Sequence, residues 1–458
     1  MTQSLARRIL SFPVAGLLAA AWSLSAPPAS ARSQFIRDAE IEATIAAYAQ
    51  PLFEAAGLDP QAVRVYLLQD DSLNAFVAGG MNLFIHTGLL MKAESANQII
   101  GVIAHETGHI AGGHLARSQD ALRNASIEAI LACIAGIGAA VVGATQSGGD
   151  GASAGAGLCA IGQQVGLRSL LQFSRTQESA ADQAGMSYLD ATRQSARGTV
   201  EFLQILTKQE ALLGVSQQPY LRSHPLTRDR IDAVKDHIEH SPYSSAVDSI
   251  DFQIRFARMR AKLIGYLQPL PRVLRAYPES DQSMPGRYAR AFGYYRAGKL
   301  PQATALVDGL LAEFPDDPYF LELKGEMLFK NGRARDALPY YQAAALAVPG
   351  SALLRLELGQ VQLEIGEPGL TKAAITELEA AVRIEPRYSM AWRQLSIAYG
   401  RDGQLPMAAL ALAETASASG KAKEARRQAD RAMQGLPEGS PAWLRAQDIY
   451  NEATAESD

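Results

Sequence analysis

Two histidines stand four residues apart in the segment His105-Glu106-Thr107-Gly108-His109, an HExxH motif in a stretch of helical composition. Residues four apart on an α-helix lie on one face, about 40° from each other around the axis. Both imidazoles can therefore bind one tetrahedral zinc ion. Glu106 is placed to take a proton from a water molecule at that ion. The motif predicts a zinc-dependent peptidase.

The HExxH motif supplies two ligands, whereas a catalytic zinc site is expected to have three protein ligands and an open position. His114 is one candidate for the third ligand. It follows His105 by nine residues, which places it on the opposite side of a continuous helix. The position that would carry the last histidine of an HExxHxxGxxH motif is Leu115. We therefore expect His114 to lie in the core or behind a ligand.

Glu178 is the favoured third ligand. It begins an ESAAD segment in a second helical stretch, predicted from about Leu170 to Thr192. Asp182 follows one helical turn later on the same face, where it can accept a hydrogen bond from a ligand histidine and fix its tautomer. Between the two acids, Ala180 and Ala181 permit close packing against the HExxH helix.

Local patterns indicate a mainly α chain with a small sheet. The helix that carries the motif is expected to begin at the N-cap Ser95 and to run to about Arg117. Two strands are expected, at Val63–Leu68 and Met81–His86. A sheet edge at Met81–His86, beside the zinc helix, is then a place where an extended peptide can bind by strand addition.

The C-terminal part of the chain repeats with a period of 34 residues: Ala291, Gly298, Ala303 and Pro315 recur as Gly325, Gly332, Ala337 and Pro349. The register continues to the C-terminus, after a short insertion near Glu367-Pro368-Gly369. This period, with small residues where helices cross, is typical of tetratricopeptide repeats. Such arrays stack helix pairs into a concave surface that binds partners or peptides.

The N-terminus indicates export. Arg7 and Arg8 precede an apolar run from Ile9 to Leu24, and Ala29-Ser30-Ala31 is a small-residue cleavage site. We expect cleavage after Ala31. A membrane anchor is the alternative, but the run is short and contains a proline.

Residues 125–168 form two apolar, Ala- and Gly-rich arms around a polar break. Each arm falls short of the ~20 residues needed to span a bilayer. A buried helical hairpin is favoured over contact with a membrane surface. The only two cysteines, Cys133 and Cys159, lie in these arms, and whether they form a disulfide or stay as buried thiols is left open.

At 458 residues the chain is too long for one core, so two or three domains are expected. Its 48% hydrophobic and 20% charged residues are those of a folded protein. A net charge of −4 gives no support for nucleic-acid binding, which requires a basic face.

The HETGH and ESAAD segments, together with Ser223-His224-Pro225 and Arg230-Ile231, resemble the gluzincin family that includes HtpX and the CAAX prenyl proteases. With its export segment and C-terminal repeats, the chain is most similar to the periplasmic BepA-like branch of that family.

The resemblance implies one Zn²⁺ per chain, bound by His105, His109 and Glu178. It also implies that His224 lies on a loop that occupies the open zinc position and must move to admit substrate. Arg230 either stabilises the oxyanion or anchors that loop. The fold implied is a zincin-type α+β metalloprotease domain with a small edge sheet, followed by an α-solenoid of tetratricopeptide repeats.

The expected division of the chain is a signal peptide (1–31), a metalloprotease domain (32–245), a helical bridge (246–284) and a repeat domain (285–458). The resemblance implies a periplasmic endopeptidase that acts on misassembled outer-membrane proteins, with the barrel-assembly machinery as partner. The alternative is a chaperone or adaptor for outer-membrane protein assembly with a latent, His-capped zinc site. A hydrolase of non-peptide bonds is less favoured, because no carbohydrate-binding aromatic cluster is apparent.

Overall fold

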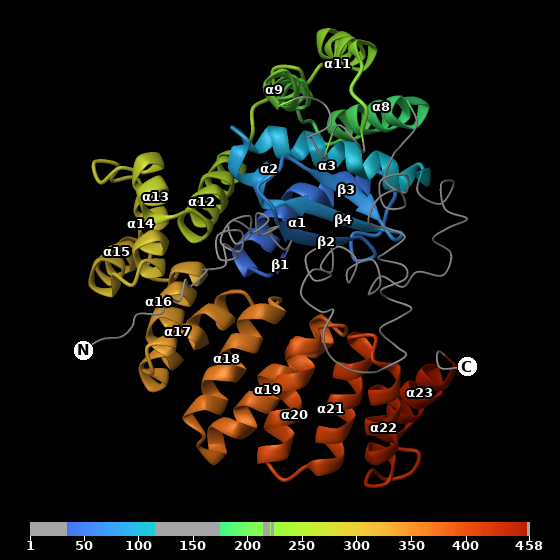
Figure 1. The fold of residues 1–458 in the computed structure, drawn as a ribbon, viewed down its shortest axis with the longest axis vertical. Coiled ribbons are helices and arrows are strands. Elements are labelled where there is room, and N and C mark those ends of the chain that lie inside the picture. The colour runs from blue at the N-terminus through green and yellow to red at the C-terminus, as the bar shows by residue number, and fades with distance from the viewer. Residues whose placement is uncertain (1–33, 115–174, 214–219, 221–223, 456–458) are drawn as a thin grey trace, which may run out of the picture.

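The computed structural model describes most of the chain: residues 34–114, 175–213, 220 and 224–455. The predicted signal peptide and the apolar segment 125–168, with both cysteines, lie outside the described residues. Figure 1 shows a sheet with helices above it and a curved array of helices below. No described helix has both the length and the apolarity of a membrane span.

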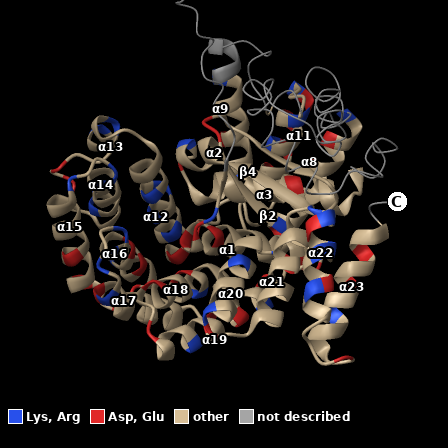
Figure 2. Cartoon of the chain, turned by 60° about the horizontal axis from the view of Figure 1, so that its bottom comes forward, with Lys and Arg blue, Asp and Glu red and all other residues tan. Residues whose placement is uncertain are grey.

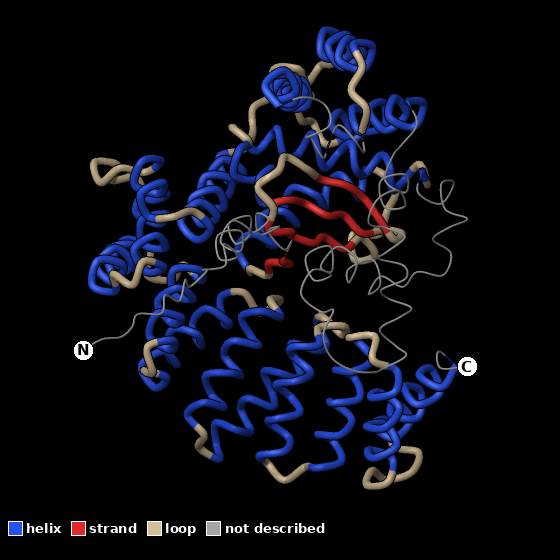
Figure 3. Tube along the Cα trace, in the orientation of Figure 1, coloured by secondary structure: helices blue, strands red, loops and turns tan. Residues whose placement is uncertain are grey.

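A four-stranded sheet lies under helix α3 (Figures 1 and 3). Its order is β1-β2-β4-β3, with β2 and β4 parallel and the outer pairs antiparallel. The predicted strands 63–68 and 81–86 are confirmed as β2 and β4. The outer strands were not predicted, because β1 has three residues and β3 is buried along its whole length, without alternation. The strands are β1 Gln34–Ile36, β2 Arg64–Gln69, β3 Ala75–Ala78 and β4 Asn82–His86.

The prediction of a sheet edge at Met81–His86 is wrong. Strand β4 pairs with β2 on one side and with β3 on the other, so its backbone groups are used within the sheet. The chain passes from β2 to the outer position of β3 before it returns as β4. The edge next to α3 is therefore β3 (Figure 1).

Helix α3 spans Ala96–Ala111. Ser95 caps it by accepting a hydrogen bond from the backbone N–H of Gln98, as predicted. The helix ends six residues before the predicted Arg117, because Gly113 takes a left-handed φ of 59° that a continuing helix does not allow.

The domain core forms where α1 and α3 pack on the sheet, and it contains large side chains such as Tyr48, Leu83 and Ile103. Two later helices, α8 and α9, cover the outer side of α3, and α11 packs on both of them (Figure 1). The helices around the core are α1 Ala39–Ala55, α2 Thr87–Lys92, α8 Arg175–Ala191, α9 Arg197–Leu213 and α11 Arg228–His240.

Helices α3 and α8 touch backbone to backbone. A Cβ atom added at Gly108 would meet the carbonyl oxygen of Ala181 at 2.6 Å, and one at Gly185 would meet the carbonyl carbon of Ala104 at 3.0 Å. Of the two alanines predicted to allow this packing, Ala181 is buried in the contact while Ala180 faces solvent. The small residues thus fix the distance between the HExxH helix and the ESAAD helix.

The predicted repeats are confirmed as an array of helices that curves beneath the sheet (Figure 1). Its glycines again allow close crossings, since a Cβ at Gly359 would meet Leu378 at 2.7 Å. Two helices, α12 Ile250–Leu267 and α13 Leu270–Ala276, precede the array, within the range 246–284 expected to form a helical bridge. The array helices are α14 Met284–Arg296, α15 Leu300–Glu313, α16 Pro318–Lys330, α17 Ala334–Ala347, α18 Ala352–Ile365, α19 Pro368–Ile384, α20 Ser389–Arg401, α21 Leu405–Ala418, α22 Ala422–Met433 and α23 Pro441–Ala455.

Buried ion pairs attach the array to the sheet domain. Arg258 of α12 binds Glu40 of α1 at 2.5 Å and Asp317, the N-cap of α16, at 2.5 Å. At a second contact, which is exposed, Arg37 binds Glu385 at 2.9 Å. These ion pairs join the sheet domain to the array.

Replacing Gly108 with alanine is expected to lower the free energy of unfolding by about 1–3 kcal/mol, because the added methyl group overpacks a backbone contact that cannot yield. Gly309→Ala is the matched control. It is also inside a helix, but nothing lies within 4 Å of the added Cβ, so it should leave stability unchanged or raise it by up to ~1 kcal/mol. Urea unfolding of both variants measures the difference. Equal effects would show that the contact between α3 and α8 is not tight.

Candidate metal centre

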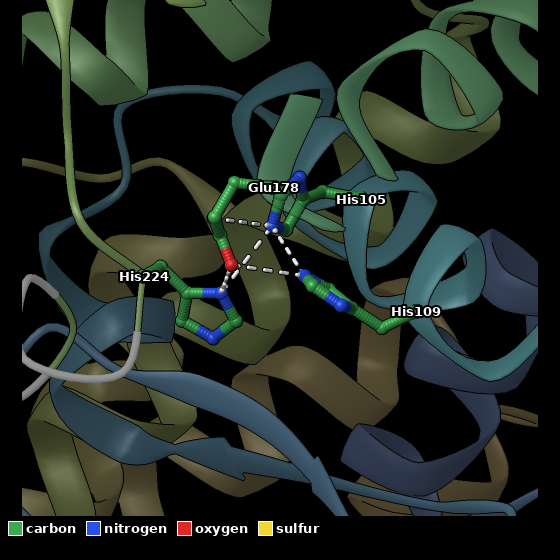
Figure 4. Close-up of side chains that lie close together, drawn as sticks. All are labelled: His105, His109, Glu178 and His224. Atoms are coloured by element: carbon green, nitrogen blue, oxygen red, sulfur yellow. Dashed lines mark hydrogen bonds and ion pairs between the residues drawn. The ribbon is translucent and has the colours of Figure 1, made fainter. Parts of the chain in front are cut away.

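Four side chains from three parts of the fold converge at one point (Figure 4). His105 and His109 come from α3, Glu178 from α8 and His224 from the loop that precedes α11. One ligand atom of each lies within 4.8 Å of all the others, and all four residues are buried. The structure thus brings together the three ligands expected from the sequence and the histidine of the expected loop.

The spacing of these atoms suits a tetrahedral metal ion. The Nε2 atoms of His105 and His109 are 3.1 Å apart, and Glu178 Oε1 lies 3.3 Å from His109 Nε2. The Nδ1 atom of His224 is 3.4 Å from His105 Nε2 and 3.1 Å from Glu178 Oε1. Ligand bonds of 2.0–2.1 Å in a tetrahedron give ligand–ligand distances of about 3.3 Å. Nitrogen and carboxylate oxygen are also the donors that zinc accepts.

Each of the two histidines of α3 is supported from behind. Asp182 Oδ1 lies 2.8 Å from His105 Nδ1, so the proton of that ring is held on Nδ1 and Nε2 is directed at the centre. His109 is supported by another imidazole, His114, with the two Nδ1 atoms 3.0 Å apart. The expectation that His114 lies behind a ligand is confirmed. The break at Gly112 and Gly113 lets the chain turn it back toward His109.

Arg230 of α11 compensates the two carboxylates of α8. Its guanidinium lies 2.6 Å from Glu178 Oε2 and 2.6 Å from Asp182 Oδ2. It also donates a 2.9 Å hydrogen bond to the carbonyl oxygen of Pro225, next to His224. One arginine therefore holds the carboxylates of the centre and the loop together.

The charged groups of the centre have strongly shifted pKa values. Burial alone lowers the pKa of His105, but its pairs with Asp182 and Glu178 outweigh this and raise the pKa to about 10. Burial lowers the pKa of His109 to about 2. Burial raises the pKa of Asp182, yet bonds from Arg230 and His105 overcome this and bring it to about 2. Asp182 thus remains an anionic acceptor at neutral pH.

Glu106 lies beside the converging atoms and is fully buried. Neither of its carboxylate oxygens has a hydrogen-bond partner, and Oε1 is 3.4 Å from His224 Nε2. Burial raises the pKa of this carboxyl, against the attraction of His224 and His105. A buried carboxylate without hydrogen bonds is costly, and the arrangement is that of a group kept ready to receive a proton.

His224 is held by an aromatic side chain that the sequence did not single out. The ring of Tyr220 stacks on the imidazole with centroids 4.6 Å apart and planes inclined by 26°. Phe202 of α9 in turn packs edge-on against Tyr220 at 5.5 Å. No sequence pattern distinguishes Tyr220 from other core tyrosines, since its role depends only on the position of the loop.

Residues 36–238, which carry every side chain of the centre, match the family model "Peptidase family M48". This part of the chain is an M48 peptidase domain. Residues 288–352 and 328–370 match the model "Tetratricopeptide repeat". The M48 match identifies the domain as a metalloprotease domain, for which a divalent metal is expected at the His and Glu cluster.

The relatives of the chain include the "Beta-barrel assembly-enhancing protease" of Yersinia pestis, which is 26% identical over 79% of this chain and 72% of its own length. The protein of that name from Escherichia coli O157:H7 is 26% identical over 66% of this chain and 61% of its own. Among solved structures, MamA aligns with 36% of this chain and 94% of its own, at 20% identity and a TM-score of 0.28. That score is too low to support an inference.

Asp182→Asn is expected to weaken zinc binding about 10–100-fold, because the amide can donate to His105 Nδ1 and so disturb the ligand tautomer. Asp190→Asn, on the same helix but bound to Ser241 away from the centre, serves as the control and should bind zinc normally. Competition with a chromophoric chelator measures both affinities. Equal affinities for the two variants would show that Asp182 does not support the ligand.

Proposed function

We propose that the chain is a zinc-dependent endopeptidase with one Zn²⁺ held by His105, His109 and Glu178. The convergence of these three donors within 4.8 Å, in a buried site beside Glu106, is the observation that carries the proposal. The M48 identity of residues 36–238 supports it.

A bound zinc ion would supply Lewis acidity, which polarises the scissile carbonyl and lowers the pKa of water toward about 7. Glu106 has the position and the vacant lone pairs to take the proton from the attacking water. The raised pKa of its carboxyl makes it a stronger base than an exposed glutamate. The same carboxyl then delivers the proton to the leaving amine.

The edge of β3 is the proposed binding site for the substrate backbone. This strand lies next to α3, and in the described residues it pairs only with β4. An extended peptide that adds to β3 would run past the HExxH residues and form main-chain hydrogen bonds that do not depend on side-chain identity.

His224 is proposed to close the site in the resting state. Its Nδ1 lies among the three ligand atoms, where the substrate carbonyl and the water would have to be. The loop is fixed at Pro225 by Arg230, which we therefore assign to anchoring rather than to the oxyanion. Substrate must displace the loop before hydrolysis.

The physiological substrates are proposed to be misfolded or misassembled outer-membrane proteins in the periplasm. The support is the name shared by the relatives, which describes proteases that enhance β-barrel assembly. We propose that the repeat array binds substrate or the barrel-assembly machinery, as such concave arrays bind partners. The matches favour this protease over the alternative of an adaptor with a latent zinc site.

His224→Ala is expected to cleave casein faster than the unmodified protein, because it vacates the fourth position of the centre. Adding Glu106→Gln should reduce that activity by about 10²–10⁴-fold while zinc stays bound, since the amide cannot accept the proton. Cleavage is followed by release of labelled fragments, and zinc by elemental analysis.

The control is His240→Ala, which removes an exposed histidine of α11 and should leave cleavage unchanged. Retained cleavage in the double variant would contradict the role of Glu106. If neither the protein nor His224→Ala cleaves casein while zinc is bound, the adaptor function is favoured instead.

A further inference from the structure

A cavity of about 390 Å³ lies between the M48 domain and the repeat array, away from the metal centre. Its walls come from β1, the start of α1, the bridge helix α12 and the array helices α16, α17 and α18. None of the metal-centre residues lines it. The proposed peptidase mechanism leaves this cavity without a role.

Acidic residues outnumber basic residues in the lining of the cavity by four to three. Four acids line it, and Figure 2 shows acidic segments gathered where α1, α16 and α18 meet. Lys262 offsets part of this charge, with Nζ 2.8 Å from Asp38 and 3.7 Å from Glu322. Lys330 also lines the cavity and offsets charge at Glu326. Arg37 is engaged elsewhere, by Glu42 and Glu385. The four acids are Asp38, Glu322, Glu326 and Glu357.

Glu357 of α18 is the acid that most clearly lacks a partner. Its Oε2 atom is buried and accepts no hydrogen bond. Burial, followed by the charges of Glu322 and Glu326, raises the pKa of Glu357 well above its usual value, and the pKa of Glu322 rises to about 8. A cation bound among these groups would let the carboxylates ionise and would satisfy the vacant oxygen.

The geometry favours an organic cation over a metal ion. In the described residues, the metal centre is the one place where three or more His, Cys, Asp or Glu side chains bring ligand atoms within 4.8 Å of one another. No three acids of the cavity therefore bring ligand atoms that close together. The acids share the lining with aromatic rings, whose faces attract ammonium and guanidinium groups: Phe35, Tyr266, Phe292, Phe329 and Tyr341.

Lys262 shows how the cavity holds such a group. Its ammonium lies 5.7 Å from the ring centre of Phe292 and also binds Asp38. The cavity thus already contains one lysine head in an aromatic and carboxylate environment. Lys330 attracts Glu326 electrostatically, but within the described residues no lysine forms an ion pair with Glu326 or Glu357.

An extended chain can reach this cavity from the sheet. β1 is the outer strand opposite β3, and in the described part of the sheet it pairs only with β2. Phe35 and Ile36 of β1 also line the cavity. A strand that adds to β1 would place one of its side chains over the acidic wall.

We propose that this cavity binds a lysine or arginine side chain of an extended polypeptide. The side chain would place its cationic head against Glu357 and Glu322 and its aliphatic stem along the aromatic rings. This is a second polypeptide-binding site, formed jointly by the M48 domain and the array. It is independent of peptidase activity, because none of its residues belongs to the metal centre.

The test uses the full chain with Glu106→Gln, so that no probe is cleaved. The probe is a short, end-blocked, fluorescein-labelled peptide of alternating valine and serine with one central lysine. A control peptide of the same sequence carries Nε-acetyl-lysine in place of that lysine. We expect fluorescence anisotropy to give a dissociation constant for the lysine peptide that is lower than that of the control peptide by about tenfold or more, as for a charge-assisted contact.

Adding Glu357→Gln should remove this difference, whereas Glu364→Gln, an exposed acid on the same helix, should preserve it. Equal binding of the two peptides by the Glu106→Gln protein would overturn the proposal, whatever the variants do. So would a lysine preference that survives Glu357→Gln. Loss of lysine-peptide binding in MgCl₂, but not in NaCl of equal ionic strength, would assign the cavity to a divalent cation and also overturn it.

Discussion

The metal centre depends on the backbone contact between α3 and α8. Gly108 and Gly185 leave no Cβ between the two helices, so the backbones pack directly on each other at Ala181 and Ala104. Only at this distance can a short acidic side chain of α8 reach the imidazoles of α3. A larger residue at either glycine would separate Glu178 from His109, which are now 3.3 Å apart.

Burying three carboxylates and four imidazoles in one place requires charge compensation. Arg230 provides it, with contacts of 2.6 Å to both Glu178 and Asp182. Breaking such a buried pair typically costs about 3–5 kcal/mol. Because the same guanidinium holds the carbonyl of Pro225, the interaction that stabilises the acids also fixes His224 over the centre. Charge compensation and the position of the His224 loop are therefore coupled.

Much of this arrangement could be predicted from local sequence. The HExxH spacing, the paired acids of ESAAD and the period of 34 residues each encode geometry within a helix or a repeat, where spacing determines which residues share a face. The close packing of Ala181 against the HExxH helix could also be predicted, because a small residue within a helix allows a second helix to come close. These features need no knowledge of how distant segments meet.

Other features depend on distant segments and could not be predicted. The outer position in the sheet belongs to β3 rather than β4, because strand order is set by pairing across the sheet. The stacking of Tyr220 on His224 depends on a loop position that the motif alone does not encode. The acidic cavity is assembled from β1, α12 and α18. More than two hundred residues separate β1 from α12 along the chain. Only the folded chain places Glu357 opposite Lys262.

X-ray absorption at the zinc edge counts the imidazoles around the ion and so tests both the metal site and the position of His224. We expect one zinc per chain, with three imidazoles in the resting protein and two in His224→Ala. An equal number of imidazoles in both proteins would show that His224 does not occupy the open position. Absence of stoichiometric zinc would contradict the assignment of the centre itself.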